Sequence, residues 1–480
     1  MSEQLQLAAE AAEQRPAVTD TTFWSAVRES LSGAHHDFTE GAISRAILLL
    51  AIPMVLEMAM ESVFAVVDVF FVAHLGADAV ATVGLTESML TLVYGLAMGL
   101  GIGATALVAR RVGERDHRGA ARAAAQSLYL GLALSLLLGA VGLFFAPNLL
   151  MLMGAAPAVV SRGATFTRIM LGGNASVLVL FLVNAIFRGA GDAAIAMRVL
   201  WLANAINIAL GPCLIFGVGP FPKLGVTGAA VATTIGRGTG ALWALSRLLR
   251  GASRIRIDSS DLRLAPEIMG RLVRLSASGT LQVMIGIASW IFLVRILSTF
   301  GSAALAGYTI AMRIIVFALL PSWGLSNAAA TMVGQALGAK RPERATRAVQ
   351  LAGWFNVAFL GSVGAVFIVA APQIIALFTT DAAIAPTGIL GLRTVAAGFL
   401  FYAWGMVYTN AFNGAGDTWT PTWINLGCFW LWEVPLGWGL AVHAGLGPLG
   451  VFLAITIAYA TLAVVSGYLF RRGTWQRQVV

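Results

Sequence analysis

The sequence carries very little charge for its length. Only 11% of its 480 residues are Asp, Glu, Lys or Arg, whereas 58% are hydrophobic. Ordinary soluble domains carry about 25% charged residues, because they must cover a water-facing surface. This shortage excludes an ordinary soluble fold and indicates a chain that lies largely in lipid.

Cysteine is also scarce, and so are the residue groups of enzyme and motor sites. Cys213 and Cys428 lie in apolar segments and fit neither a disulfide framework nor a metal site. The sequence shows no plausible Ser/His/Asp set, metal-ligand cluster or phosphate-binding loop. We therefore expect no enzyme, no cofactor and no ATP-driven pump.

The polar start of the chain lacks the pattern of a signal peptide. Residues 1–42 are predicted to form a cytoplasmic tail, in which Asp20–Leu31 could form a short interfacial helix. The net charge of +9 does not indicate nucleic-acid binding, because the basic residues lie in short gaps between apolar runs.

Apolar runs of the length that crosses a bilayer, about 20 residues, recur along the rest of the chain. They predict an all-α integral membrane protein of twelve transmembrane helices. The predicted spans are 44–74, 79–108, 119–145, 158–189, 194–217, 225–249, 268–299, 302–336, 344–371, 384–413, 418–442 and 447–471.

Basic residues gather in alternate connections between these spans. Since such residues mark the cytoplasmic side, they predict that both termini are cytoplasmic in a plasma (inner) membrane. The clusters lie at 110–122, 247–274, 340–347 and 471–477.

An internal repeat divides the chain into two halves. The segment 187–192, Phe-Arg-Gly-Ala-Gly-Asp, recurs 225 residues later as Phe-Asn-Gly-Ala-Gly-Asp. Each half has six helices, so the second half enters the membrane from the same side as the first, and the repeat is parallel. Such a repeat usually places a substrate between two halves that rock against each other. A channel pore could also lie on the axis that relates the halves. The predicted parts are a tail (1–42), an N-lobe (43–250), a cytoplasmic linker (251–266), a C-lobe (267–472) and a second cytoplasmic tail (473–480).

Three acids of the first span are the best candidates for a functional site. Glu57, Glu61 and Asp68 are spaced so that they share one helix face. Because charges in hydrocarbon are costly, this stripe predicts a cation or proton site. The alternative is that the acids pair with buried arginines such as Arg237 or Arg313.

Further polar and aromatic residues within the spans are candidates for a substrate cavity or an ion site. Glu87 and Glu433 are acids, and Trp430 could stack on a flat cation or belong to an aromatic belt or to helix packing. Neutral oxygen donors could bind a hard cation or form interhelical hydrogen bonds; these are Asn184, Asn207 and Thr233. Two overlapping GxxxG steps at Gly95, Gly99 and Gly103 predict close helix packing.

Several of these motifs together resemble the multidrug and toxic compound extrusion (MATE) family over residues 43–472. The resemblance implies a V-shaped pair of six-helix bundles. It also implies export of mostly cationic amphipathic compounds by antiport against sodium or protons. The segments that carry it are 52–53, 66–76, 109–113, 188–192, 311–314, 333–335 and 413–417.

The resemblance also implies roles for single residues. Asp68 matches the first-helix aspartate that prokaryotic members use for coupling. In the DinF-like branch this aspartate shares a sodium site with residues that match Asn184, Asn207 and Thr233.

The chain departs from this pattern in both halves. A second aspartate of the DinF-like site corresponds to Gly211 here, so Glu61 and Glu57 could supply the missing charge or shift coupling toward protons. In the C-lobe, Gln282 and Tyr402 stand near the places of acids found in the NorM-like branch.

The leading hypothesis is therefore a secondary antiporter of the inner membrane, acting as a monomer on a small cationic substrate without nucleic acid. The main alternative is a flippase or exporter of a lipid-linked or anionic amphiphile, for which intramembrane Arg237, Arg295 and Arg313 would line the cavity. A membrane enzyme and a channel are weaker alternatives.

Overall fold

The protein is built almost entirely of helices. The computed structural model describes residues 23–33, 37–251 and 253–478. The first half contains α2 (Phe23–Ser32), α3 (Ile43–Ala73), α4 (Ala77–Gly113), α5 (His117–Leu152), α6 (Pro157–Gly172), α7 (Asn174–Ala190), α8 (Ala193–Phe216) and α9 (Val226–Leu249). The second half contains η1 (Ser259–Leu262), α10 (Pro266–Ser298), α11 (Ser302–Gly338), α12 (Pro342–Ala376), α13 (Ala385–Ala397), α14 (Phe399–Ala415), α15 (Trp419–Asn425), η2 (Leu426–Glu433), α16 (Val434–Trp438), η3 (Gly439–His443), α17 (Pro448–Arg471) and η4 (Thr474–Arg477).

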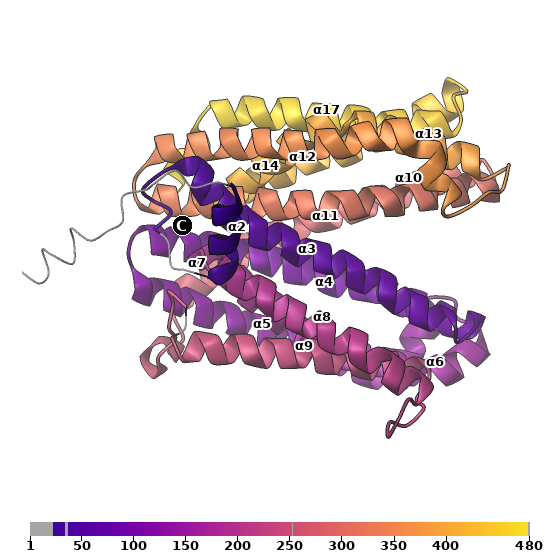
Figure 1. Ribbon diagram of the computed structural model, residues 1–480, viewed down its shortest axis with the longest axis horizontal. Helices are drawn as coiled ribbons and strands as arrows, with labels where there is room; N and C mark the ends of the chain where they lie inside the picture. Colours follow the sequence, from indigo (N-terminus) through magenta and orange to yellow (C-terminus); the bar gives the residue numbers. More distant parts are fainter. Residues whose placement is uncertain (1–22, 34–36, 252, 479–480) are drawn as a thin grey trace, which may run out of the picture.

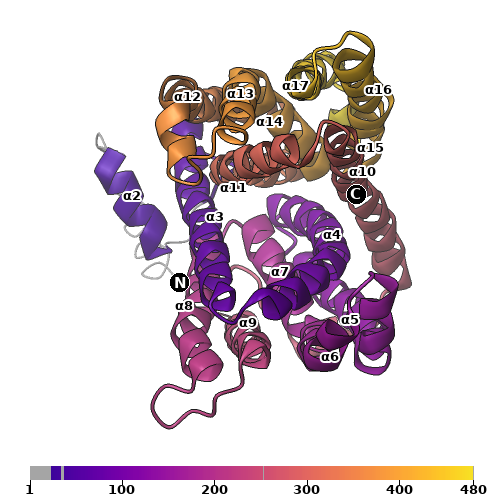
Figure 2. The ribbon, with the colours of Figure 1, turned by 90° about the vertical axis from the view of Figure 1, so that its right-hand side faces the viewer.

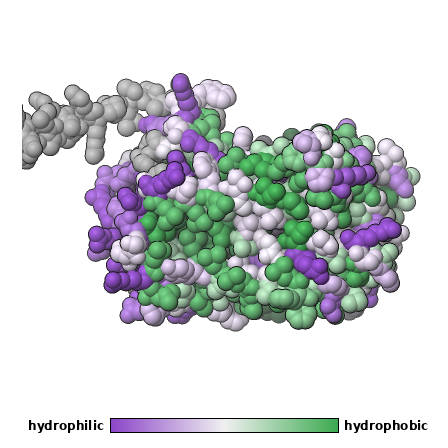
Figure 3. Space-filling model, turned by 90° about the horizontal axis from the view of Figure 1, so that it is seen from below, coloured by the Kyte–Doolittle hydropathy of each residue, from purple (hydrophilic) through white to green (hydrophobic). Residues whose placement is uncertain are grey.

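These elements provide the twelve predicted transmembrane helices. In the described part of the chain, nine helices are long and apolar enough to cross a membrane, with α6 and α7 counted together. A tenth span is the pair α13 and α14, which bend by 55° at Gly398. The other two are α9, which contains Arg237 and Arg247, and the run from α15 to η3, which π-helical turns divide. Figure 3 shows the corresponding surface, with hydrophobic side chains across the middle and hydrophilic ones at both ends.

The predicted repeat is visible in the backbone itself. Gly191 ends α7 and Gly416 ends α14 in the left-handed conformation, with φ of 89° and 84°. Arg168 and Arg393 each donate from Nε to a carbonyl oxygen 25 residues earlier, at 3.0 and 2.9 Å. Both pairs are separated by 225 residues, so the two halves repeat local geometry as well as sequence.

Each half forms one bundle of six membrane spans, and the two bundles meet along α3, α4, α10 and α11 (Figures 1 and 2). The predicted packing role of Gly95, Gly99 and Gly103 is confirmed here, since all three face α10. A β-carbon on Gly99 would lie only 2.1 Å from Thr280 Oγ1. The absence of side chains therefore lets α4 and α10 approach closely.

A short segment before α3, residues 37–41, connects the two bundles at one end of the molecule. We call it the N-terminal strap. Three guanidinium nitrogens of Arg344, in α12, donate to strap carbonyl oxygens at 2.7–2.9 Å, and Arg341 Nη1 donates to a fourth at 2.7 Å. From the first half, Arg115 lies 3.6 Å from two strap carboxylates. The described part of the predicted tail helix is α2, which precedes the strap. Glu29 of α2 forms an ion pair with Arg45 of α3 at 2.5 Å.

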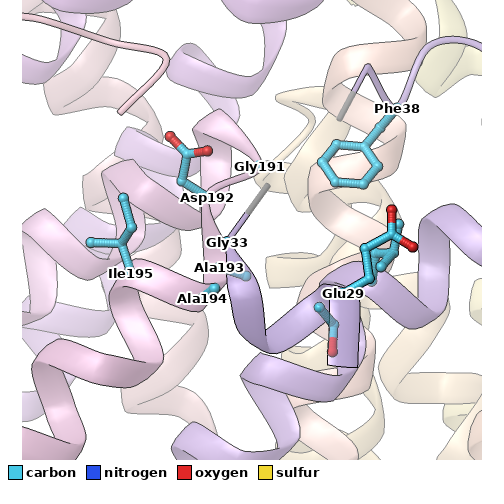
Figure 4. Close-up of a pocket in the computed structure, with 10 residues that line it drawn as sticks. Glu29, Gly33, Phe38, Gly191, Asp192, Ala193, Ala194 and Ile195 are labelled. Atoms are coloured by element: carbon cyan, nitrogen blue, oxygen red, sulfur yellow. The ribbon is translucent and has the colours of Figure 1, made fainter. Parts of the chain in front are cut away.

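The strap and the linker meet at the end of α7. Figure 4 shows a small pocket here, with Phe38 facing Gly191. A β-carbon on Gly191 would lie 2.7 Å from the Phe38 ring. The next residue, Asp192, accepts hydrogen bonds from Ser253 Oγ at 2.6 Å and from the Arg254 amide at 2.9 Å. The linker is thus fixed to the first bundle.

Candidate functional site

The innermost acid of α3 is bound to α7. Glu57 is 1% exposed, and its Oε1 accepts from Arg188 Nη1 at 2.7 Å and from Asn184 Nδ2 at 3.2 Å. Its second oxygen, Oε2, has no hydrogen-bond partner among the described residues. The alternative raised from the sequence, pairing with a buried arginine, therefore holds for Glu57, with Arg188 as the partner.

The next acid, one turn along α3, is bound to α8 and α9. Glu61 accepts from Arg237 Nη2 at 2.8 Å and from Asn204 Nδ2 at 3.0 Å. Arg237 is only 2% exposed, and its guanidinium lies over the rings of Phe64 and Tyr94, at 5.4 and 6.0 Å. This pairing neutralises the charge of Glu61 within the bundle.

The third acid differs from the other two. Asp68 is half-buried, and within the described part of the chain it has neither a hydrogen bond nor an ion pair within 4 Å. Arg237 and Glu87 interact with it only at longer range. Asp68 is thus the acid of the α3 stripe whose carboxylate is available to a ligand.

The predicted sodium ligands lie in two separate places. Asn207 Nδ2 donates to Thr233 Oγ1 at 2.7 Å, and both residues are buried. Asn184 instead contacts Glu57, which precedes Asp68 by eleven residues, or about 16 Å of helix. The structure therefore does not bring Asn184 to Asp68, because the Glu57 carboxylate holds its amide further along α3.

Gly211, one turn after Asn207 on α8, contributes no side chain to the predicted ion site. A β-carbon there would lie 3.9 Å from Asn207 Oδ1 and would otherwise meet open space. The position thus has room for the carboxylate that the family pattern places there, but this chain supplies none.

The predicted cavity residues fall into two kinds of environment. Glu87 of α4 is exposed and interacts electrostatically with Asp68 and with the exposed Arg313 of α11. Gln282 is 8% exposed, with Oε1 unpartnered among the described residues. Of these two residues, Glu87 is therefore the one that is open to a solute.

The remaining aromatic candidates are engaged in packing. Trp430 donates from Nε1 to the Ile285 carbonyl oxygen at 3.0 Å, and its ring contacts Phe292 edge-on at 5.2 Å. Tyr402 stacks on Tyr459 with ring centroids 4.0 Å apart. The structure thus assigns Trp430 to the contact between η2 and α10, the packing alternative raised from the sequence.

Two partners in this site were not predicted from the sequence. Arg188 belongs to the repeated motif, and Asn204 belongs to none of the sequence patterns described above. Their signals were present, since an arginine within reach of a span needs a counter-ion and Asn204 lies one helical turn before Asn207.

Comparisons with known proteins agree with this arrangement. A model of the MatE family matches residues 53–213 and 276–438, one segment in each half. The chain belongs to the MatE family. It is a multi-pass membrane protein of a family of transporters, not of enzymes.

Curated and solved MatE relatives cover nearly the whole chain. The probable multidrug resistance protein YoeA of Bacillus subtilis is 26% identical over 89% of this chain and 93% of its own. The probable multidrug resistance protein NorM of Thermotoga maritima is 24% identical over 91% and 94%. A MATE crystal structure in complex with MaL6 superposes with a TM-score of 0.86 at 28% identity, over 91% of this chain and 97% of that one.

Proposed function

We propose that this MatE-family protein is a secondary active exporter that moves small cationic amphiphiles out of the cell by antiport against protons or sodium, through alternating access. The observation that carries the proposal is the contrast along α3. Glu57 and Glu61 are neutralised by arginines, while Asp68 has no such partner and remains open. An acid of the α3 stripe that no arginine neutralises, within an apolar bundle, is a suitable group for exchanging a coupling ion.

We further infer that the membrane is the bacterial inner membrane, that both termini are cytoplasmic and that the transporter acts as a monomer. The basic clusters support this orientation, and the N-terminal strap lies at the same end as three of them. The linker is hydrogen-bonded to Asp192, between α7 and α8, so we propose that it belongs with the N-lobe.

An anionic amphiphile is the second candidate substrate. Arg313 is exposed on α11 opposite Glu87, so the same space offers both signs of charge. A MatE relative of Shewanella oneidensis, 26% identical over 72% of this chain, is named an FAD transporter. A relative with this name makes an anionic solute worth testing in the same assay.

The test uses proteoliposomes loaded with ethidium, with a sodium gradient and a pH gradient imposed in separate runs. We expect one gradient to drive dye movement in the native protein and Asp68→Asn to abolish it. The matched control is Asp78→Asn, because Asp78 forms an exposed pair with Arg162 at 3.2 Å, and such pairs contribute little.

Each outcome has a defined meaning. Movement of the dye by one gradient names the coupling ion, and its loss in Asp68→Asn alone supports the proposed site. If neither gradient moves ethidium but one moves a flavin nucleotide, the anionic substrate replaces the cationic one. If Asp68→Asn and Asp78→Asn transport equally well, Asp68 is not the coupling acid.

A further inference from the structure

The C-lobe contains a buried acid that the N-lobe site does not involve. Glu433 ends η2 and is 4% exposed. Among the described residues it has no hydrogen bond and no ion pair, in contrast to Glu57 and Glu61. An ionised carboxylate in such a place is costly, and a buried acid without a partner inside a membrane span is a functional candidate.

Three tyrosines from three different helices share a packed cluster with the neighbour of this acid. Tyr308 of α11 and Tyr459 of α17 are 3% and 7% exposed, and Tyr402 of α14 stacks on Tyr459. All three interact electrostatically with Glu433, and they share one packed cluster with its neighbour Val434. The Tyr308 hydroxyl has no hydrogen-bond partner in the described chain. Hydroxyl donors are thus present for a carboxylate, while none is engaged by Glu433 in this state.

The local backbone is irregular at the same place. Glu433 lies at the junction of the π-helical segment η2 with α16, and Pro435 follows two residues later. Proline removes one backbone donor from the helix, and π-helical turns are frequent at functional sites. The chain thus departs from ideal helix geometry where it carries the unpaired acid.

No positive charge neutralises Glu433 from the elements packed against it. In the described chain, α15 and α16 carry no titratable residue, and Arg295 of α10 is exposed and forms no ion pair. Tyr459 is the titratable group that α17 presents, and Cys428 is the one that η2 itself presents. Arg313 of α11 is also exposed and interacts with Glu87. A proton is therefore a suitable group to balance the charge of this carboxyl.

We propose that Glu433 is a proton-binding carboxyl of the C-lobe, loaded and unloaded once per transport cycle and separate from Asp68, with the Tyr308 hydroxyl as hydrogen-bond donor to its ionised form. Glu433 is only 4% exposed, so it carries the proton rather than contacting a bulky substrate. On unloading, the carboxyl O–H bond breaks and the proton leaves to water, and on loading the carboxylate takes a proton from water. The inference rests on the proposed antiport.

Infrared spectroscopy and proton counting test this site directly. The native protein should show the C=O absorption of a protonated carboxyl group at pH 7, and Glu433→Gln should remove it while Glu433→Asp retains a shifted band. On addition of ethidium in weak buffer, Glu433→Gln should release fewer protons than the native protein. Tyr308→Phe should move the pH at which the band disappears to higher pH, since the ionised form loses a donor. The surface control is Glu267→Gln, at the exposed start of α10.

The outcomes separate this inference from the proposed function. If the native protein transports along a gradient but the band and the proton count are unchanged in Glu433→Gln, the C-lobe site is wrong and the antiport stands. If no gradient drives transport, the proposed function fails, whatever Glu433 does. If Glu433→Gln does not fold, an unchanged band in Tyr308→Phe at every pH overturns the proposal.

Discussion

At the scale of single residues, the α3 stripe shows how a membrane bundle tolerates several charges. Two acids and two arginines form hydrogen-bonded pairs, and each pair receives an asparagine amide as well. A buried pair adds little net stability, but breaking it leaves an uncompensated charge. The pairs therefore constrain which neighbouring positions can change.

Arg237→Met should destabilise the protein by about 3–5 kcal/mol, because Glu61 would lose its counter-ion inside the bundle. Adding Glu61→Gln should restore much of the loss, since the charge is then removed as well. Thermal unfolding in detergent measures both effects. Arg162→Met, which breaks an exposed pair with Asp78, should cost under about 1 kcal/mol. Equal losses for the two arginines would contradict this reading.

The sequence was informative about acids and less so about their partners. The helical period placed Glu57, Glu61 and Asp68 on one face, and it suggested Arg237 as a partner. It could not show that Asn184 lies by Glu57 rather than by Asp68. That distinction depends on the relative height of α3 and α7, which no pattern within either helix records.

At the scale of elements, the contact of α4 with α10 depends on glycine. Gly99→Ala should destabilise the protein by about 1–3 kcal/mol, because the new methyl group would lie 2.1 Å from Thr280 Oγ1 and 2.4 Å from its amide nitrogen. Gly84→Ala in the same helix meets nothing within 4 Å and should be neutral or stabilising by up to about 1 kcal/mol. Thermal unfolding of the two variants side by side gives the comparison; equal stability would mean that α10 shifts to accept the methyl group.

The N-terminal strap depends on Arg344. Arg344→Gln should loosen the strap, because three donors to its carbonyl oxygens are removed. One hydrogen bond from a charged donor is worth about 1.5 kcal/mol or more, so hydrogen exchange over residues 37–45 should accelerate by about tenfold or more. Arg347→Gln, an exposed neighbour, is the control. If hydrogen exchange in Arg344→Gln is unchanged, Arg341 and Arg115 are sufficient to hold the strap in place.

The boundaries of most spans were predictable, whereas irregularities within them were not. The run 418–442 was predicted as one ordinary span, and the structure divides it by two π-helical segments. The run 384–413 bends by 55° at Gly398. A hydropathy profile shows the length and the polarity of an apolar run. Neither property reveals whether one helical turn contains an extra residue.

At the scale of the whole molecule, the two bundles hold each other through side chains as well as through the linker. Thr331 and Gln335 of α11 donate to the carbonyl oxygens of Arg188 and Gly189 in α7, each at 3.0 Å. Together with the glycine contacts of α4, these bonds close one end of the molecule. The internal repeat, with its offset of 225 residues, predicts the two halves. It does not predict which helices form the contact between them.

A chain divided between Leu264 and Ala265 should still assemble. The linker stays with the first fragment through Asp192, and the halves keep their contact along α4 and α10. We expect co-expressed fragments 1–264 and 265–480 to co-purify and to transport in the ethidium assay, while either fragment alone does not. Failure to co-purify would mean that the covalent linker holds the lobes together.

The π-helical turns of the eleventh span also have an evolutionary consequence. A π turn accommodates one residue more than an α turn, so this span can lose a residue without losing its length across the bilayer. A deletion between Leu426 and Leu431 that the π turn absorbs would leave Glu433 facing its tyrosines, whereas the same deletion in a regular α-helical turn would rotate it by about 100°. Relatives that are one residue shorter here would then keep both the fold and the acid site, and a count of residues between Asp417 and Pro435 would show which of them lack a π turn.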